Sequence, residues 1–385
     1  MTWRRVALKD IGQIIGGGTP KTSISENFGD DYPWITPKDL SQQKSRYVLR
    51  GERGISAQGL SSSSAKLLPK GTVLLSSRAP IGLTAIAAQP VTTNQGCRSF
   101  VPGPEVDTLF MYYLLGSMTE EFKRNANGST FKEISGSTLA SIEVSIPSLR
   151  EQRAIAATLG ALDDKIESNR RSASLISELL DTHSQKFGPT LPRVPLGDIA
   201  TPVKESLNPS NLGNTQVDHF SLPAFDRDAR PERVAASSIM SNKLRVPKLA
   251  ILLSRLNPRF NRTWWASADA EAPALASTEF LVFTSEDEHR LAAIWLALRD
   301  TYFRGEIPKR VTGTSGSHQR VKPADVLAIE VPDFTRAPTA LKESALAMLQ
   351  RSETLRVESA RLSALRDALL PELLSGRIRV PFERS

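Results

Sequence analysis

The sequence predicts an α+β protein with two mixed α/β domains, separated by two long helices that form an antiparallel coiled coil with pseudo-twofold symmetry. The first observation is an internal repeat, because residues 5–11 (RVALKDI) recur as residues 193–199 (RVPLGDI). The second is that each copy is followed by a long segment whose apolar residues recur at alternating spacings of four and three, which is typical of paired helices. A length of 385 residues agrees with two or three folded domains.

The repeat extends along both halves of the chain. Residues 68–78 resemble residues 246–255, since each has a Pro-Lys pair, an apolar run and a Ser-Arg pair, and residues 139–147 resemble residues 326–332. The offset between the copies drifts, which indicates loops of different length on one scaffold, and such loops often carry specificity. We place the first domain at 1–147, the first long spacer helix at 148–187, the second domain at 188–336, and the second long spacer helix with a C-terminal tail at 337–385.

Within the domains, short apolar runs at 73–75 and 249–253 predict buried strands. Residues 110–115 and 291–298 predict helices. Proline and glycine are dense between these segments, so the connecting loops are expected to be long.

The long helices have recognisable ends and a continuous seam. Pro147 and the capping-box spacing of Ser148 and Glu151 predict the start of the first helix, and Gly376 predicts the end of the second. The seam of the first helix is Ile155, Leu159, Leu162, Ile166, Asn169, Ala173, Ile176, Leu180, His183 and Phe187. The seam of the second is Leu341, Ala345, Met348, Ser352, Leu355, Ser359, Leu362, Arg366, Leu369 and Leu373.

We expect the two helices to pack on each other in antiparallel orientation. The alternative is that each helix folds back on its own domain. Asn169 and His183 either fix the register of the seam or face solvent.

Composition excludes several classes of site. A single cysteine, Cys97, excludes an intramolecular disulfide and a CxxC zinc site, and four dispersed histidines argue against a histidine-rich metal cluster. The N-terminal residues lack the apolar stretch of a secretory signal, and no apolar run is long enough to span a membrane. We therefore expect a cytoplasmic protein without a metal site.

The net charge of +8 has an uneven distribution. Residues 53–104 and 233–268 contain no acidic residue, and the two windows occupy matching places in the repeat. A solvated basic surface is the alternative for either window alone. Two windows at equivalent places favour binding to a double-stranded polyanion, DNA or RNA.

Several side chains in these windows, and in two matched polar loops at 128–132 and 316–320, could contact bases or phosphates. Asparagine and glutamine can pair with adenine, and arginine can pair with guanine. Arg78 and Arg255 are matched in the repeat, each following a serine. The candidate DNA-binding residues are Arg78, Asn94, Gln95, Arg98, Ser129, Thr130, Lys132, Arg255, Arg259, Arg262, His318, Gln319 and Arg320.

The chain resembles a known family in motifs, repeat and domain order together. The motifs are residues 17–20 (GGTP), 32–35 (YPWI), 39–40 (DL), the Gly-Ser-Thr loop at 128–130, an Ile-x-Val-x-Ile-Pro strand and a Glu-Gln-x-x-Ile helix start at 151–155. Together they resemble the specificity subunit of type I restriction-modification systems, over the whole chain. The second copy departs from this pattern, since it lacks the GGTP and PWI motifs and the same helix start.

The resemblance implies a non-catalytic subunit whose two target-recognition domains each read one half of a bipartite double-stranded DNA site. The helices would set the spacing between the halves and dock methyltransferase subunits, two in number, and restriction and translocase subunits would join them. No cofactor is then expected in this chain, because S-adenosylmethionine, ATP and Mg would be held by the partner subunits.

The alternative function is a diverged, free-standing DNA adenine methyltransferase. Residues 257–260 (NPRF) resemble the Asn-Pro-Pro-Tyr/Phe motif of amino-methyltransferases, but the third position is arginine and no glycine-rich cofactor motif precedes it. Residues 16–22 lack the glycine spacing of a phosphate-binding loop. We therefore predict no catalytic residue. A coiled-coil scaffold that binds no DNA would leave the matched basic windows unexplained.

Overall fold

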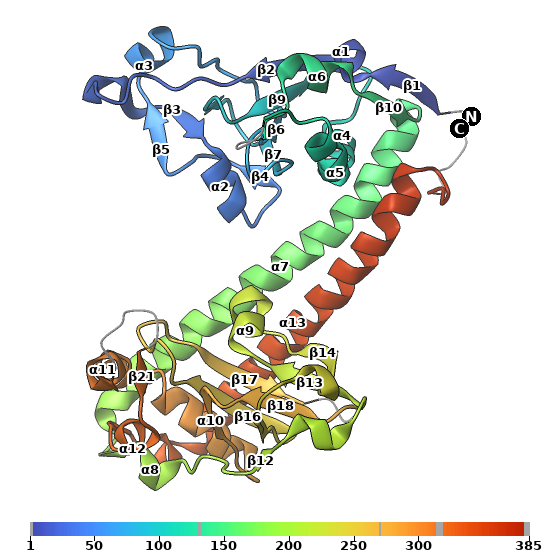
Figure 1. Cartoon of the computed structure of the whole chain (residues 1–385). Coiled ribbons are helices and arrows are strands. Elements are labelled where there is room, and N and C mark those ends of the chain that lie inside the picture. The colour runs from blue at the N-terminus through green and yellow to red at the C-terminus, as the bar shows by residue number, and fades with distance from the viewer. Residues whose placement is uncertain (1–2, 129–131, 269–270, 313–318, 381–385) are drawn as a thin grey trace. The chain divides into compact units, whose positions relative to one another are not determined.

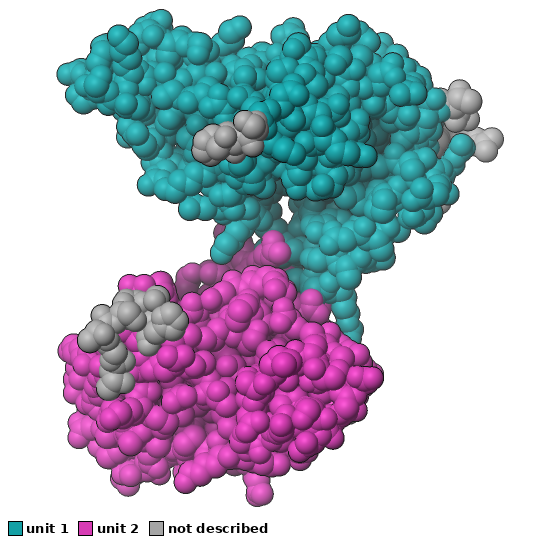
Figure 2. Space-filling view, in the orientation of Figure 1, with its two compact units in different colours: residues 1–168, 359–385 teal, residues 169–358 magenta. Residues whose placement is uncertain are grey.

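The computed structural model describes residues 3–128, 132–268, 271–312 and 319–380. The chain forms two compact units, of which unit 1 consists of residues 1–168 and 359–385 and unit 2 of residues 169–358 (Figure 2). Each unit thus combines one of the mixed α/β domains with a segment of both long helices (Figure 1).

Unit 1 contains two small sheets and a terminal strand pair. The larger sheet has the order β2 (Gly12–Gly16), β9 (Arg98–Pro102), β6 (Val73–Leu75), β7 (Thr84–Ala87), β4 (Tyr47–Val48), and the smaller has the order β5 (Arg53–Ile55), β3 (Phe28–Ile35), β8 (Thr92–Thr93). The terminal strand pair consists of β1 (Arg4–Ala7) and β10 (Glu143–Ile146), which are antiparallel. The helices of the domain are α1 (Leu8–Ile11), α2 (Pro37–Gln42), α3 (Ala57–Ser61), α4 (Thr108–Ser117), α5 (Thr119–Arg124) and α6 (Gly136–Ser141).

The main core of unit 1 lies between the larger sheet, α4 and the long helices. Phe100 on β9 and Phe110 on α4 are fully buried in it, together with Ile155, Leu159 and Leu373 of the long helices. Burying an aromatic or aliphatic side chain of this size contributes roughly 1.5–3 kcal/mol. The sheet that carries the candidate residues is therefore fixed to the helices by apolar packing.

Unit 2 has the same kinds of element. Its larger sheet has the order β12 (Ser206–Leu207), β15 (Lys243–Arg245), β18 (Ala274–Ser277), β13 (Gln216–Phe220), β14 (Glu232–Ala235), and its smaller sheet has the order β17 (Thr263–Ser267), β16 (Leu249–Ser254), β19 (Phe280–Phe283). Two further strand pairs are β11 (Arg193–Pro195) with β22 (Glu330–Pro332) and β20 (Val311–Thr312) with β21 (Arg320–Val321). The helices of the domain are α8 (Leu196–Ile199), α9 (Leu222–Asp228), α10 (Glu288–Ala297), α11 (Thr301–Glu306) and α12 (Pro323–Leu327). Short 3₁₀ helices lie at Ser25–Asn27, Gly188–Thr190, Pro209–Leu212, Ala236–Ser238, Ile307–Arg310 and Phe334–Arg336.

The internal repeat is visible in the topology of the two domains. In each, the first strand pairs antiparallel with the last (β1 with β10, β11 with β22), and a one-turn helix follows the first strand. The apolar runs predicted as buried strands are β6 and β16, and the predicted helices are α4 and α10. These predictions are confirmed.

The long helices are α7 (Leu149–Phe187) and α13 (Thr339–Leu374). At the start of α7, Oγ of Ser148 accepts a hydrogen bond from the backbone N of Glu151 at 3.4 Å. After α13, Gly376 adopts a left-handed conformation with φ 71° and donates its N–H to Leu373 O at 3.3 Å. Both predicted boundary residues therefore act as caps.

Within each unit the two helix segments run antiparallel. In unit 1, Asp163 pairs with Arg366 at 2.6 Å, while Leu159 and Leu369 pack in the same core further along. In unit 2, Nδ2 of Asn169 donates to Glu358 at 2.9 Å, while Leu180 and Ala345 pack in the same core. All predicted seam residues are buried or half-buried.

The antiparallel pairing is confirmed, and the alternative also contributes, because the helix segments of each unit pack on the domain core as well. Asn169 is only 1% exposed and donates a hydrogen bond to Glu358, so it does not face solvent, and a role in fixing the register stays a prediction. No helix in the described parts of the chain has the length and apolarity to cross a membrane.

Candidate nucleic-acid interface

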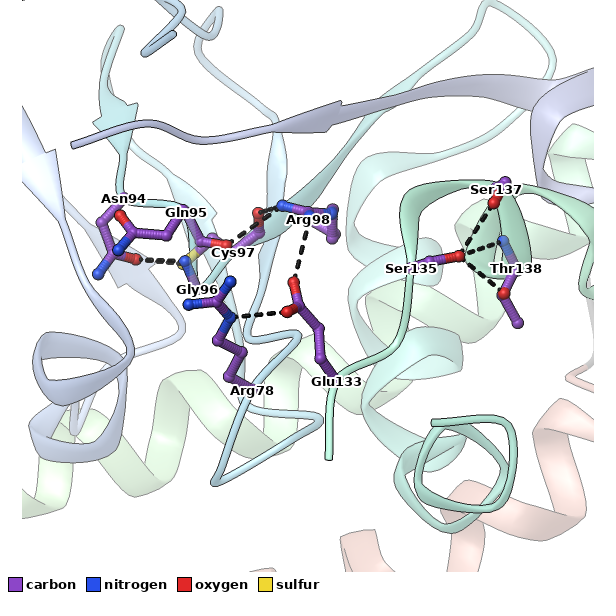
Figure 3. Close-up of polar contacts among 10 residues, drawn as sticks. All are labelled: Arg78, Asn94, Gln95, Gly96, Cys97, Arg98, Glu133, Ser135, Ser137 and Thr138. Carbon is purple, nitrogen blue, oxygen red and sulfur yellow. Dashed lines mark hydrogen bonds and ion pairs between the residues drawn. The ribbon is translucent and has the colours of Figure 1, made fainter. Parts of the chain in front are cut away.

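In unit 1, two predicted DNA-binding arginines converge on one carboxylate (Figure 3). Nε of Arg78 donates to Oε2 of Glu133 at 2.8 Å, and Nη2 of Arg98 donates to Oε1 of the same residue at 3.1 Å. Arg78 comes from the loop after β6, Arg98 from the first position of β9, and Glu133 from the segment before α6. The side chain of Arg78 is 47% exposed and that of Arg98 is 22% exposed.

Arg98 is held on both sides of its guanidinium. Nη1 donates to the carbonyl oxygens of Gln95 and Cys97, each at 3.2 Å, while Nη2 contacts Glu133. Three fixed acceptors leave this side chain little rotational freedom. It is therefore a preorganised donor at the start of β9.

The turn between β8 and β9 carries the other candidates of the first window. Oδ1 of Asn94 accepts from the backbone N of Gly96 at 3.0 Å and lies 3.8 Å from Sγ of Cys97. Its NH₂ group makes no hydrogen bond within the described part of the chain. Gln95 is exposed and its Oε1 accepts a hydrogen bond from Thr19. A bidentate contact of Asn94 with adenine would need its acceptor oxygen too.

The GGTP motif (residues 17–20) packs against this turn. A Cβ on Gly17 would lie 2.1 Å from the carbonyl oxygen of Asn94, so only glycine allows the chain to pass there. The Trp34 indole donates to the carbonyl oxygen of Gly18 at 3.0 Å. Two motifs that carry the family resemblance, GGTP and YPWI, therefore contact each other and position the 92–98 segment.

The polar loop at 128–132 is only partly described. Lys132 is exposed next to Glu133, while Ser129 and Thr130 lie outside the described residues. Beyond Glu133, Oγ of Ser135 accepts from the backbone N of Thr138 and caps α6 (Figure 3).

In unit 2, Arg255 and Arg320 gather around Glu279. The guanidinium of Arg320 contacts the Glu279 carboxylate, with a shortest distance of 2.7 Å. Nη2 of Arg255 donates to the carbonyl oxygen of Thr278 at 2.7 Å. The carbonyl oxygen of Gln319 accepts from the backbone N of Asn257 at 2.8 Å, and His318 lies outside the described residues.

Arg259 and Arg262 lie beside an exposed aromatic ring. Their guanidinium carbons are 4.7 and 5.1 Å from the ring centroid of Phe260, whose side chain is 49% exposed. Nε and Nη2 of Arg262 also bond to the carboxylate of Asp226, at 2.6 and 2.9 Å. An exposed ring between two arginines suits stacking as well as phosphate contact.

The match between Arg78 and Arg255 is off by one residue. In unit 1 the backbone N of Ile134 donates to Ser77 O, and in unit 2 the backbone N of Val321 donates to Arg255 O, both at 3.1 Å. The neighbouring bridges pair Arg78 with Glu133 and Leu256 with Arg320. Backbone pairing therefore places Arg255 at the position of Ser77, and Arg320 at the position of Glu133.

The basic windows lack acidic residues only along the sequence. Three carboxylates from outside both windows pair with candidate arginines. Glu133 pairs with Arg78 and Arg98, Asp226 pairs with Arg262, and Glu279 pairs with Arg320. Sequence reasoning missed these carboxylates and also Phe260. Phe260 adjoins two candidate arginines and could have been found from that spacing, whereas nothing local in the sequence points to the three carboxylates.

Cys97 does not supply a nucleophile. Its side chain is fully buried, and burial raises the pKa of the thiol to about 12. The thiol is therefore protonated near neutral pH, and a protonated, buried thiol is inert.

Comparison with known proteins matches the N-terminal part of the chain to a family model. The model of the type I restriction modification DNA specificity domain matches residues 1–177. The type I restriction enzyme MjaIX specificity subunit of Methanocaldococcus jannaschii is 45% identical over 179 residues, which are 46% of this chain and 41% of that protein. The type I restriction enzyme HindI specificity subunit of Haemophilus influenzae is 35% identical over 149 residues, which are 38% of this chain and 32% of that protein.

The matched segments thus span less than half of the length of these curated relatives. Over almost its full length, the fold is similar to the crystal structure of the type I restriction-modification system S subunit from M. genitalium. That similarity has a TM-score of 0.62 at 16% identity and covers 99% of this chain and 97% of that one. Over residues 1–177, the chain is similar to the type I restriction modification DNA specificity domain.

Proposed function

We propose that the chain is the DNA sequence-specificity subunit of a type I restriction-modification complex. Each of the two domains reads one half of a bipartite double-stranded DNA site, and the helices α7 and α13 set the spacing between the halves. The observation that carries the proposal is the specificity-domain match over residues 1–177, followed by a second domain of related topology and a second long helix.

The long helices are also the docking site for methyltransferase subunits, two per chain. Leu175 and Leu179 lie one turn apart on α7, and their side chains are 51% and 50% exposed. Apolar residues at this spacing form one stripe on a helix, and an exposed stripe suits a partner helix. Restriction and translocase subunits complete the assembly.

The chain itself is non-catalytic and cytoplasmic, and it holds no cofactor. S-adenosylmethionine, ATP and Mg bind to the partner subunits. A diverged, free-standing DNA adenine methyltransferase is not favoured, because the relatives that match are named as specificity subunits.

The test combines activity with genome-wide mapping. The purified chain alone should transfer no methyl group from S-adenosylmethionine to DNA. Co-expressed with its cognate methyltransferase subunit in a host lacking other adenine methylation, it should produce methylated adenines in one split motif with a fixed gap. Methyl transfer by the chain alone, or methylation without a bipartite motif, would overturn the proposal.

Docking is tested separately with Leu175→Asp combined with Leu179→Asp. This variant should fail to co-purify with the methyltransferase subunit while circular dichroism remains that of the parent. Gln185→Asp, an exposed position on the same helix outside the leucine pair, is the matched control and should co-purify normally. Unchanged co-purification of the double variant would remove this stripe from the interface.

A further inference from the structure

Glu133 occupies an unusual place for a carboxylate in a DNA-binding protein. It lies beside Lys132 in a basic region, yet it accepts hydrogen bonds from two arginines that come from different elements. Its side chain is 28% exposed, so it lies at the surface rather than in the core. A carboxylate here weakens the attraction of the surface for phosphates, and such a cost suggests a gain in geometry.

The geometry concerns which edge of Arg78 is left for a partner. Glu133 takes the Nε–H of Arg78, and among the described residues Nη1 and Nη2 make no hydrogen bond. These two nitrogens form the terminal fork of the guanidinium. Fixing Nε therefore points the fork away from Glu133, on a side chain that is 47% exposed.

A terminal fork of this kind binds two adjacent acceptors at once. Phosphate oxygens and the O6 and N7 atoms of guanine both offer such a pair. The local charge favours a guanine edge over a phosphate. Arg78 and Arg98 share the carboxylate of Glu133, so these three residues carry only one net positive charge. A phosphate would approach that carboxylate at the cost of like-charge repulsion, whereas a guanine edge is neutral.

We propose that Arg78 reads one guanine in the half-site bound by unit 1, through O6 and N7 in the major groove, and that Glu133 is the positioning residue that aims it. The inference rests on the proposed function, since it requires a DNA half-site. Arg98, fixed by two carbonyl oxygens, holds the other oxygen of Glu133 in place.

The described residues of unit 2 do not repeat this arrangement. At the position of Glu133 it carries Arg320, which pairs with Glu279 from the turn between β18 and β19. Guanine reading by an Arg78-type contact is therefore confined to one half-site. Glu279 supplies a matched control in the other domain.

The experiment uses the chain in complex with its methyltransferase subunit. Binding to DNA libraries randomised across the methylated motif is measured for the parent, Arg78→Ala, Glu133→Gln, Glu279→Gln and Glu120→Gln. Arg78→Ala should reduce preference for guanine about 10- to 100-fold at one base pair of the unit 1 half-site and leave the other positions unchanged.

Glu133→Gln should reduce the preference at the same base pair and leave affinity for non-specific DNA equal or higher, because a negative charge has been removed. A general loss of structure would lower both the base preference and the affinity for non-specific DNA. A lower base preference without a lower non-specific affinity therefore identifies Glu133 as a positioning residue. Glu279→Gln should leave the unit 1 half-site unchanged. Glu120→Gln, which breaks an exposed surface pair with Lys123, should change neither half-site.

Three outcomes would overturn the inference. One is uniform weakening by Arg78→Ala with a salt dependence reduced by about one ion, which indicates a phosphate contact. Another is a Glu133→Gln variant with the base preference of the parent. The last is a lost preference for a base other than guanine. A parent complex without any sequence preference would instead refute the proposed function.

Discussion

Arg299 anchors the domain of unit 2 to α7, and its replacement by alanine tests how firmly. The residue lies two positions after the end of α10, and its side chain is 8% exposed. Nε and Nη2 bond to the carboxylate of Asp181 at 2.7 and 2.8 Å, and Nη2 also donates to Ser177 O at 2.9 Å. Removing one partner of a buried pair costs about 3–5 kcal/mol, because the other charge remains buried.

The cost at this site is smaller, since Asp181 is 30% exposed and also contacts Arg304 at 3.0 Å. We expect Arg299→Ala to destabilise unit 2 by about 2 kcal/mol, between the values for exposed and buried pairs. Arg299→Lys should recover only part of this, because an ammonium group cannot form the two parallel hydrogen bonds.

Amide hydrogen exchange of the full chain measures the effect unit by unit. A loss of 2 kcal/mol corresponds to roughly 30-fold faster exchange of the slowest amides in α10 and in the unit 2 segment of α7. Amides of α4, in unit 1, serve as the internal reference. Lys309→Ala, which removes an exposed pair with Glu306, should change exchange less than about threefold. An Arg299→Ala variant no faster than this control would refute the anchoring role.

Three further outcomes are expected. Cys97 should resist thiol reagents in the native chain and react on unfolding. Because the pKa of its thiol is raised to about 12 in the folded chain, the free energy of unfolding should fall as pH rises above the unfolded thiol pKa of about 8.5. Cys97→Ala should remove that part of the decline, measured as urea midpoints. Gly17→Ala should lower the melting temperature, since its Cβ would lie 2.1 Å from Asn94 O, whereas Gly29→Ala, whose nearest contact is at 3.5 Å, should not. Asn169→Ala should speed amide exchange in the adjacent turns of α7 by removing its hydrogen bond to Glu358, worth about 1 kcal/mol, and unchanged exchange there would deny the register role.

The long helices and the repeat could be predicted because their signals are local or periodic. A seam with alternating spacings of four and three constrains which face of a helix is buried, whatever covers it. That is why every seam residue is buried or half-buried, down to the polar Asn169. Which segments of the chain make up each unit was harder to predict from the sequence. Contacts of α13 with the unit 1 core, such as those of Leu373, join residues far apart in the sequence.

The charge pattern shows where prediction from sequence ends. An acid-free window describes neighbours along the chain, whereas electrostatics acts between neighbours in space. Glu133, from the segment before α6, pairs with Arg78 in the loop after β6, and Glu279, from the turn between β18 and β19, pairs with Arg320. The off-by-one shift has the same origin, because backbone pairing rather than residue identity decides which side chain takes each place.

These pairings change the meaning of the basic windows. A surface of unpaired arginines would bind any duplex through its phosphates, with strong salt dependence and little discrimination. Carboxylates that hold arginines by one edge reduce that general attraction and leave a directed fork, which favours recognition of particular base edges. Because the position of Glu133 in unit 1 is taken by Arg320 in unit 2, one scaffold presents two different sets of donors and acceptors. Such a difference is what two unlike half-sites would require of a duplicated domain.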